Sequence, residues 1–315
     1  MQTETRYSLV VMTRNRPGPL ERCLASIERL RWDGDRPEVI LVDDGSDSPA
    51  GRISADFQSL RIVNVRLEHL GVAAARNAGI EHSTGACVAF IADDYALPES
   101  YLSDIDRFFR AHPEAQVISH NIRPRGALLF QPVQQLYFDL AIGQAVPPGQ
   151  TGREVVFSYS LPASRAAMFR REVFDRVGRF NERLLVGEDG EFGQRMARCG
   201  IPVYLFSHKR VDHFDARGSL DYFRQRLRYG RSYVRSGVSG LPLASMSRPA
   251  FIAKMLSMLK NKCRLWWQVS GRMGSRRQYL LLSPFLVLFL CFFYYGAYEE
   301  FCELRKAGLD DLPAV

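Results

Sequence analysis

Short apolar runs alternate with amphipathic segments along the first 125 residues. Five runs are almost continuously apolar and are predicted to be strands: residues 7–13, 38–44, 61–67, 86–93 and 116–122. Between them, residues 19–30, 71–82 and 98–111 space their apolar side chains at helical intervals. Strands buried on both faces and separated by helices are typical of βαβ units. The pattern therefore predicts an α/β fold with a mainly parallel sheet flanked by helices.

The middle of the chain has a weaker pattern. In residues 126–160, Pro132, Pro147, Pro148 and Gly149 interrupt any periodicity, so we expect a loop there that makes variable substrate contacts. Order returns in residues 164–206, which predict a strand, two helices and a final strand.

Near the C-terminus, residues 278–298 form an uncharged apolar run. A helix of about 20 residues spans about 30 Å, the thickness of a bilayer core. We interpret the run as a transmembrane or membrane-embedded helix; a buried core helix and a re-entrant segment are the alternatives. Tyr294, Tyr295 and Tyr298 gather near one end, as interfacial anchors do.

A basic segment precedes this run. The formal net charge of the chain is +8, and between Arg217 and Arg277 the only acidic residue is Asp221. Beside an apolar run, such a segment favours anionic lipid over nucleic acid as a partner. Residues 251–269 mix Trp266 and Trp267 with lysines and predict an interfacial helix, unless they form an ordinary amphipathic helix packed on the catalytic domain.

These segments predict the domain organisation. We expect a catalytic domain in residues 1–235, a basic amphipathic region in 236–277, the apolar helix in 278–298 and a short tail in 299–315. Six widely spaced cysteines indicate reduced thiols, and the N-terminus shows no signal-peptide pattern. With the positive-inside rule, this predicts a membrane protein whose catalytic domain is cytoplasmic and whose tail lies across the bilayer.

Acidic residues mark three loops where chemistry is expected. Asp43 and Asp44 follow the second strand, where a carboxylate can bind a base or ribose hydroxyl; a polar turn is the simpler alternative. Asp93 and Asp94 end the fourth strand, and two adjacent carboxylates persist most readily around a divalent cation. Such a cation would neutralise a diphosphate leaving group.

The third acidic cluster begins a predicted helix. Glu188 and Asp189 open this helix, and Glu191 follows one turn in. Acids here are common as helix caps. The functional alternative is a general base that takes the proton from an attacking hydroxyl.

Six motifs in fixed order carry a resemblance. TRNRP, VILVDDGS, GVAAARNAGI, FIADDYALP, FRREVFDRVGRFNE and GEDGEFGQRMARCG together resemble family 2 glycosyltransferases of the GT-A fold, over roughly residues 6–215. The resemblance implies inverting transfer of a sugar from a nucleotide diphosphate donor, with a UDP-sugar as the default. The membrane segments add the expectation of a membrane-proximal, lipid-linked or saccharide acceptor.

The resemblance also implies roles for single residues. It places Thr13, Asp44, Arg76 and Asp93 at the donor. Asp94, with Asp93 and His213, would hold Mn²⁺ or Mg²⁺. Asp189 would be the catalytic base, and Glu188 would orient or contact the acceptor. Ala92 stands where many members have a further aspartate, which weakens the metal assignment.

Two rival functions share part of this pattern. A nucleotidyltransferase would share the sheet and the metal carboxylates, but would be expected to carry a glycine-rich basic loop after the first strand, where this chain has TRNRPGPL. A non-catalytic membrane scaffold would explain Ala92 but not the retained Asp93, Asp94 and Asp189. The sequence contains neither a P-loop nor a GxGxxG motif.

Overall fold

The chain folds into two compact units. The computed structural model describes residues 7–32, 34–125, 131–146, 154–159, 166–184, 187–214, 219–235 and 246–307. The first unit comprises Met1–Arg125, Gly152–Glu182 and Glu188–Asp215, and the second comprises Gly126–Thr151, Arg183–Gly187 and Ala216–Val315.

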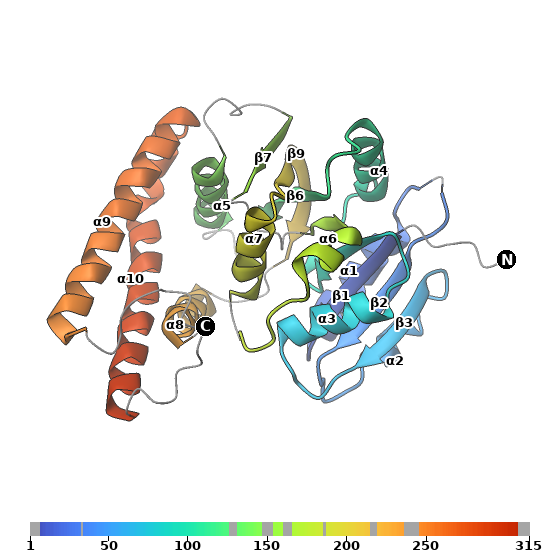
Figure 1. Ribbon diagram of the computed structural model, residues 1–315, viewed down its shortest axis with the longest axis horizontal. Helices are drawn as coiled ribbons and strands as arrows, with labels where there is room; N and C mark the ends of the chain where they lie inside the picture. Colours follow the sequence, from blue (N-terminus) through green and yellow to red (C-terminus); the bar gives the residue numbers. More distant parts are fainter. Residues whose placement is uncertain are drawn as a thin grey trace. The chain divides into compact units, whose positions relative to one another are not determined.

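The first unit is built on one mixed sheet (Figure 1). Its strands, within the described part of the chain, are β1 (Tyr7–Thr13), β2 (Glu38–Asp43), β3 (Arg61–Arg66), β4 (Cys87–Ala92), β5 (Tyr95–Ala96), β6 (Val117–Pro124), β7 (Val155–Ser158), β8 (Met168–Arg170) and β9 (Val203–His213). The strand order is β3-β2-β1-β4-β8-β6-β9-β5, and β7 pairs with β9. The five predicted strands are all present, within two residues at each end.

The strand directions show which strands end at the same edge of the sheet. β3, β2, β1 and β4 run parallel to one another, whereas β8 runs antiparallel to both β4 and β6. The prediction of a mainly parallel sheet therefore describes the first half of the sheet, and the second half is mixed. In the parallel half, β2, β1 and β4 end at the same edge, because Thr13 pairs with Asp43 and Met12 pairs with Ala92.

Helices connect the strands and cover the apolar sheet. They are α1 (Pro17–Glu28), α2 (Gly51–Ser54), α3 (Val72–His82), α4 (Tyr101–Ala111), α6 (Glu172–Val177) and α7 (Glu188–Arg198). α3 packs on β1 and β2. A Cβ atom at Gly79 would lie 2.2 Å from Cγ1 of Val10, so this close approach of helix to sheet requires glycine. The strand–helix–helix–strand order predicted for residues 164–206 is confirmed as β8, α6, α7 and β9.

The prediction of a loop over residues 126–160 is wrong for two parts of that range. Residues Gln131–Ala145 form helix α5, and Val155–Ser158 form strand β7. Pro132 does not interrupt α5, because it lies in the first turn, where a missing N–H breaks no helical hydrogen bond. Pro147, Pro148 and Gly149 lie outside the described residues.

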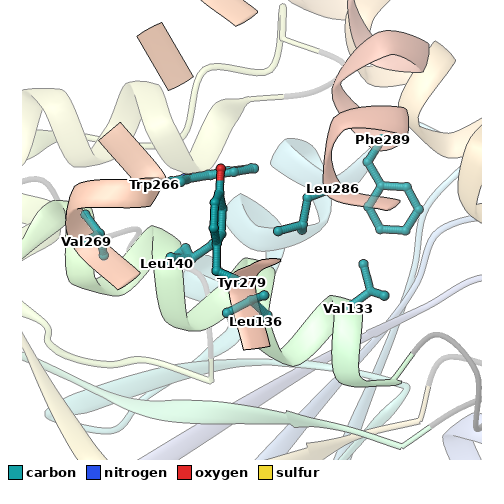
Figure 2. Close-up of a cluster of buried hydrophobic side chains, with 8 residues drawn as sticks. All are labelled: Val133, Leu136, Leu140, Trp266, Val269, Tyr279, Leu286 and Phe289. Atoms are coloured by element: carbon teal, nitrogen blue, oxygen red, sulfur yellow. The ribbon is translucent and has the colours of Figure 1, made fainter. Parts of the chain in front are cut away.

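The second unit is helical. α10 (Arg276–Ala307) packs with α5, α8 (Ser219–Arg235) and α9 (Arg248–Arg272), and α5 also packs with α9. Figure 2 shows one of its cores, in which side chains of α5, α9 and α10 meet: Val133, Leu136, Leu140, Trp266, Val269, Tyr279, Leu286 and Phe289. A second core joins α8, α9 and α10 through Val234, Phe251, Met255, Ala297 and Phe301. The helices of this unit therefore stabilise one another by shared apolar burial.

The packing divides the chain differently from the predicted boundary at residue 235. α5 and α8, which were assigned to the catalytic domain, pack with α9 and α10 because their apolar faces complete the two helical cores. α10 also continues past the predicted end of the apolar run at residue 298, through Glu299, Glu300 and Phe301 to Ala307. Residues 308–315 of the predicted tail lie outside the described residues.

α8 and α10 approach each other closely at two glycines. A Cβ atom at Gly230 would lie 1.8 Å from the carbonyl oxygen of Phe293, and one at Gly296 would lie 2.2 Å from that of Leu227. Because both obstacles are backbone atoms, any side chain at either position pushes the helices apart.

Replacement of Gly230 by Ala is expected to destabilise the second unit. Overpacking of this kind costs about 1–3 kcal/mol, which exceeds the helix-propensity gain of about 1 kcal/mol. The measurement is the free energy of unfolding by denaturant. Gly18→Ala in α1 is the matched control, because its Cβ meets no atom within 4 Å. An equal or greater stability for Gly230→Ala would contradict this packing.

Candidate active site

Two adjacent carboxylates form the centre of the site. Asp93 and Asp94 follow β4 directly and are 3% and 6% exposed. The hydroxyl of Thr13, at the end of β1, donates a hydrogen bond of 2.7 Å to Oδ2 of Asp93. The structure therefore brings together the ends of two adjacent parallel strands.

Arg16 bridges the two carboxylates. Its Nη1 lies 2.6 Å from Oδ1 of Asp93 and 3.0 Å from Oδ2 of Asp94, and its Nη2 lies 3.0 Å from the same Asp94 oxygen. A guanidinium between two buried carboxylates neutralises charges that would otherwise repel each other. Sequence reasoning did not select Arg16.

A turn after β1 directs Arg16 to the carboxylates. Asn15 has φ of 52°, a left-handed conformation that Asn adopts more readily than most residues. The turn is held by two hydrogen bonds, from the Asn15 N–H to Oγ of Ser46 and from the Asp47 N–H to Oδ1 of Asn15. Arg16 then stands at the start of α1, and Pro17 occupies the first helical position.

His213 approaches Asp94 from the opposite half of the sheet. It ends β9, where it pairs with Tyr95 of β5, and its Nε2 lies 3.4 Å from Oδ2 of Asp94. The backbone N–H of Phe214 donates to the Asp94 carbonyl at 2.8 Å, which fixes the two segments together. The structure therefore brings Asp94 and His213 together, whereas Asp93 contacts Thr13 and Arg16.

The surroundings keep Asp94 ionised. Burial acts to raise the pKa of Asp94, but the hydrogen bond and charge of His213, together with Arg16, outweigh burial and lower the pKa to about 2. Asp94 is therefore ionised at neutral pH and does not have to lose a proton before it binds a cation.

Asp43 and Asp44 hold the loops at the end of β2. Asp44 accepts backbone hydrogen bonds from Leu70 at 2.7 Å and Gly71 at 3.0 Å, so it fixes the entry to α3. Asp43 accepts from the N–H groups of Ser46 and Ala50, at 2.8 and 2.9 Å. Asp43 therefore stabilises the loop after β2, and Asp44 links the end of β2 to the start of α3.

Arg76 and Glu188 form a second buried ion pair. Arg76 lies on α3 and Glu188 begins α7, and both are less than 10% exposed. The Arg76 guanidinium also lies over the rings of Phe180 and Phe90, at 5.1 and 5.9 Å from their centroids. Arg76, predicted to contact the donor, here positions Glu188.

Asp189 follows Glu188 in the first turn of α7 and is partly exposed. Its Oδ1 accepts a hydrogen bond of 2.8 Å from the N–H of Gly190. No ion pair within the described residues engages Asp189, so its carboxylate differs from those of Asp93, Asp94 and Glu188. A carboxylate without a cationic partner retains the capacity to accept a proton.

The side chains of Asp93, Asp94 and His213 could hold a divalent cation that a bound substrate also coordinates. Within the described part of the chain, no group of three His, Cys, Asp or Glu side chains is placed to hold a metal ion by itself. Mg²⁺ is nevertheless commonly held by one or two carboxylates plus substrate phosphates. Asp94 and Asp93, with the imidazole of His213, supply donors of the correct type, and Arg16 occupies the position between the carboxylates.

A family model identifies the chain. The model described as glycosyl transferase family 2 matches residues 8–178, which is more than half of the sequence. The chain therefore belongs to glycosyl transferase family 2 and is a glycosyltransferase.

Curated relatives agree with this assignment. AglE of Haloferax volcanii is 23% identical over 235 residues, which cover 72% of this chain and 73% of AglE. A PGL/p-HBAD biosynthesis glycosyltransferase of Mycobacterium bovis is 27% identical over 225 residues, which cover 68% and 78%. GlyA of Streptococcus pneumoniae is 24% identical over 218 residues, but these cover 30% of GlyA, so the chain matches less than a third of that protein.

Solved structures confirm the GT-A fold. The mannosyltransferase PcManGT from Pyrobaculum calidifontis, in complex with GDP-Man and Mn²⁺, has a TM-score of 0.60 at 17% identity, covering 98% of this chain and 89% of that chain. TarS 1-349 of S. aureus, in complex with UDP-GlcNAc, has a TM-score of 0.55 at 17% identity, covering 96% and 92%.

Replacement of Arg16 by Gln is expected to have two opposite effects. Without metal, the free energy of unfolding should fall by about 1–3 kcal/mol, because two buried carboxylates lose their cation while partial exposure of Arg16 limits the loss. Mn²⁺ should bind about tenfold more tightly, because no guanidinium competes for the carboxylates; tenfold corresponds to about 1.4 kcal/mol.

Denaturant unfolding and calorimetric titration with Mn²⁺ measure both effects. Arg14→Gln is the matched control, because it removes the same charge from an exposed side chain two residues away. Weaker Mn²⁺ binding by the Arg16 variant would show instead that Arg16 helps to hold the metal or its ligands.

Proposed function

We propose that the protein is an inverting glycosyltransferase that uses a metal-bound nucleotide diphosphate sugar and acts on a membrane-proximal saccharide acceptor, either lipid-linked or not. The observation that carries the proposal is the buried Asp93–Asp94 pair at the carboxyl edge of the sheet, with Asp189 as a separate, partly exposed carboxylate. Family membership supports the reaction class, and the different surroundings of these carboxylates support a separate role for each.

Thr13 and Asp44 are proposed to receive the nucleotide. Both lie at the ends of adjacent strands, and the Asp44 N–H donates to the Thr13 carbonyl at 3.0 Å. This edge is where open α/β sheets bind ligands. PcManGT was solved with GDP-Man and TarS with UDP-GlcNAc, so both nucleotides have precedents on this fold, and a UDP-sugar remains the default donor.

Asp94 is proposed to hold Mn²⁺ or Mg²⁺, assisted by Asp93 and His213. A cation bound there supplies Lewis-acid stabilisation to a diphosphate leaving group. Asp94 already carries its full charge, and Thr13 orients Asp93 through their hydrogen bond. Support for a metal comes from the donor set and from the Mn²⁺ in PcManGT.

Asp189 is proposed to be the general base. An acceptor hydroxyl that attacks the anomeric carbon must lose its proton, and a carboxylate outside any ion pair can take it. Glu188, held by Arg76, is proposed to orient the acceptor beside it. Arg76 would thereby influence the acceptor through Glu188. One base and no enzyme nucleophile suit a single displacement, which inverts the anomeric configuration.

Membrane association with the catalytic unit on the cytoplasmic side is proposed for the whole chain. Arg276–Lys306 is long and apolar enough to cross a membrane, with a mean hydropathy of 2.1 in its most apolar stretch, of which 22% is buried. The low buried share disfavours an ordinary core helix. Length and composition alone do not distinguish a spanning helix from one that lies at the surface.

Asp94→Asn should reduce turnover by about 100-fold or more, because the amide is a poor metal ligand and the leaving group loses charge stabilisation. The fold should remain intact, because the side chain lies at a strand end. Release of nucleoside diphosphate from a sugar nucleotide, with and without chelator, measures this effect. Asp47→Asn makes the same change at an exposed position of this edge and should be neutral. Undiminished turnover of the Asp94 variant, or full wild-type activity in excess chelator, would remove the metal assignment.

Asp189→Asn should lower kcat by about 10²-fold or more, since the amide keeps the shape but cannot accept the proton. Donor affinity should survive, which calorimetric titration with the donor and Mn²⁺ measures. Asp175→Asn on α6 is an exposed control for the same substitution. A collapse of donor affinity with turnover at saturation unchanged would make Asp189 a donor ligand and leave the base unassigned.

A further inference from the structure

α10 has two charged neighbours in the second unit. α9 runs antiparallel to it: the rings of Phe251 and Phe301 stack at 4.2 Å at one end, and Trp267 lies 6.0 Å from Tyr279 at the other. Gly274, with φ of 67°, lies in the turn between the two helices. α9 carries six basic residues and no acidic one: Arg248, Lys254, Lys260, Lys262, Arg264 and Arg272.

α8 runs in the same direction as α10 along the second half of the apolar run. Phe223 contacts Phe289 and Phe292, with ring centroids 5.5 and 4.7 Å apart. Further along, Arg231 pairs with Glu299 at 2.8 Å. Between these contacts α8 carries three further arginines: Arg224, Arg226 and Arg228.

This packing is incompatible with a simple transmembrane α10. If residues 278–298 filled the hydrocarbon core, the parallel segment of α8 would enter it with its arginines, and the antiparallel α9 would enter it with its lysines. Charged side chains at that depth are costly and are normally found in pairs or beside water-filled cavities. Arg228 and Lys260 are instead exposed.

α10 nevertheless leaves an apolar stripe uncovered. Leu281, Phe285 and Leu288 are 75%, 44% and 41% exposed, and Tyr295 is 57% exposed. Their spacing of four, three and seven residues places them on one side of the helix. On α9, Ile252, Leu256 and Trp267 are also exposed, at 44%, 61% and 38%.

We propose that α9 and α10 lie in the plane of the membrane and insert this apolar surface among the headgroups of an anionic bilayer, without crossing it. A helix with an exposed apolar stripe and basic residues nearby has the composition of an interfacial helix. The basic side chains can reach the headgroups while their aliphatic stems cover apolar surface. Anionic lipid is favoured over a second copy of the chain, because two α9 helices bring like charges together.

The proposal changes the topology expected from the sequence. Glu299 and Glu300 were placed across the bilayer from the basic segment, yet they pair with Arg231 and Arg235 of α8. In the in-plane arrangement, the end of α10 stays on the same side as the catalytic unit. This inference rests on the proposed membrane association and specifies its geometry.

Vesicle binding by the purified full chain tests the docking surface. Vesicles of phosphatidylcholine with and without 30% phosphatidylserine are the probes, and co-sedimentation is the readout. We expect binding to the anionic vesicles that weakens in 0.5 M salt. Leu281→Glu, alone and with Phe285→Glu, should lower partitioning at least tenfold. Tyr159→Glu, an exposed aromatic residue in the first unit, is the matched control.

Point variants are preferable to removal of α10, whose buried side completes both helical cores. Unchanged thermal unfolding of the variants shows that they fold. Unchanged vesicle binding by Leu281→Glu/Phe285→Glu would overturn the proposal. If the same variant instead dissociated a dimer in light scattering and vesicle binding stayed the same, the surface would belong to a second copy.

Side-specific labelling separates in-plane from spanning helices. A cysteine introduced as Ala314→Cys, in a chain whose native cysteines are replaced by serine, should react with an impermeant maleimide only from the side that also labels Arg14→Cys. Reaction of the two positions from opposite sides would establish a spanning helix and contradict the proposal. Both readouts are independent of sugar transfer, so a chain that docks but does not transfer would refute the proposed function alone.

Discussion

Two buried carboxylates side by side are the constraint on which the active site depends. Asp93 and Asp94 repel each other at the end of an apolar strand, and burial raises the cost of that repulsion. Groups from three separate segments stabilise the pair: the hydroxyl of Thr13 at the end of β1, the guanidinium of Arg16 at the start of α1 and the imidazole of His213 at the end of β9. In the proposed mechanism a cation would bind to the Asp94 carboxylate, which is already ionised before any ligand arrives.

The acidic residues of the site have different surroundings. Asp94 is kept ionised by its neighbours, and Glu188 is held by Arg76. Asp189 stands outside these pairs. In the proposed mechanism the first group stabilises the departing diphosphate and the last accepts the proton of the acceptor, so the different surroundings of the acids correspond to different roles.

The parts of this arrangement that follow from local pattern could be predicted. Parallel strands end at a common edge, where open α/β sheets bind ligands, so the acids after the second and fourth strands mark that edge, and β2 and β4 place them on either side of β1. The role of Arg16 depends on the left-handed turn at Asn15, which apolar periodicity does not report. Helix α5 does not follow from the sequence pattern, because Pro132 suggests a break in a helix, whereas the effect of a proline depends on its position in the helix. The neighbours of α10 could not be predicted, because hydropathy describes one helix and not what packs beside it.

The most direct test of the account is a crystal structure with a nucleoside diphosphate and Mn²⁺, in which anomalous scattering locates the metal. The account predicts one Mn²⁺ bound to the carboxylate of Asp94 and to the diphosphate, with Arg16 withdrawn from between Asp93 and Asp94. A diphosphate bound at this edge with no metal and with Arg16 still bridging the two carboxylates would contradict it.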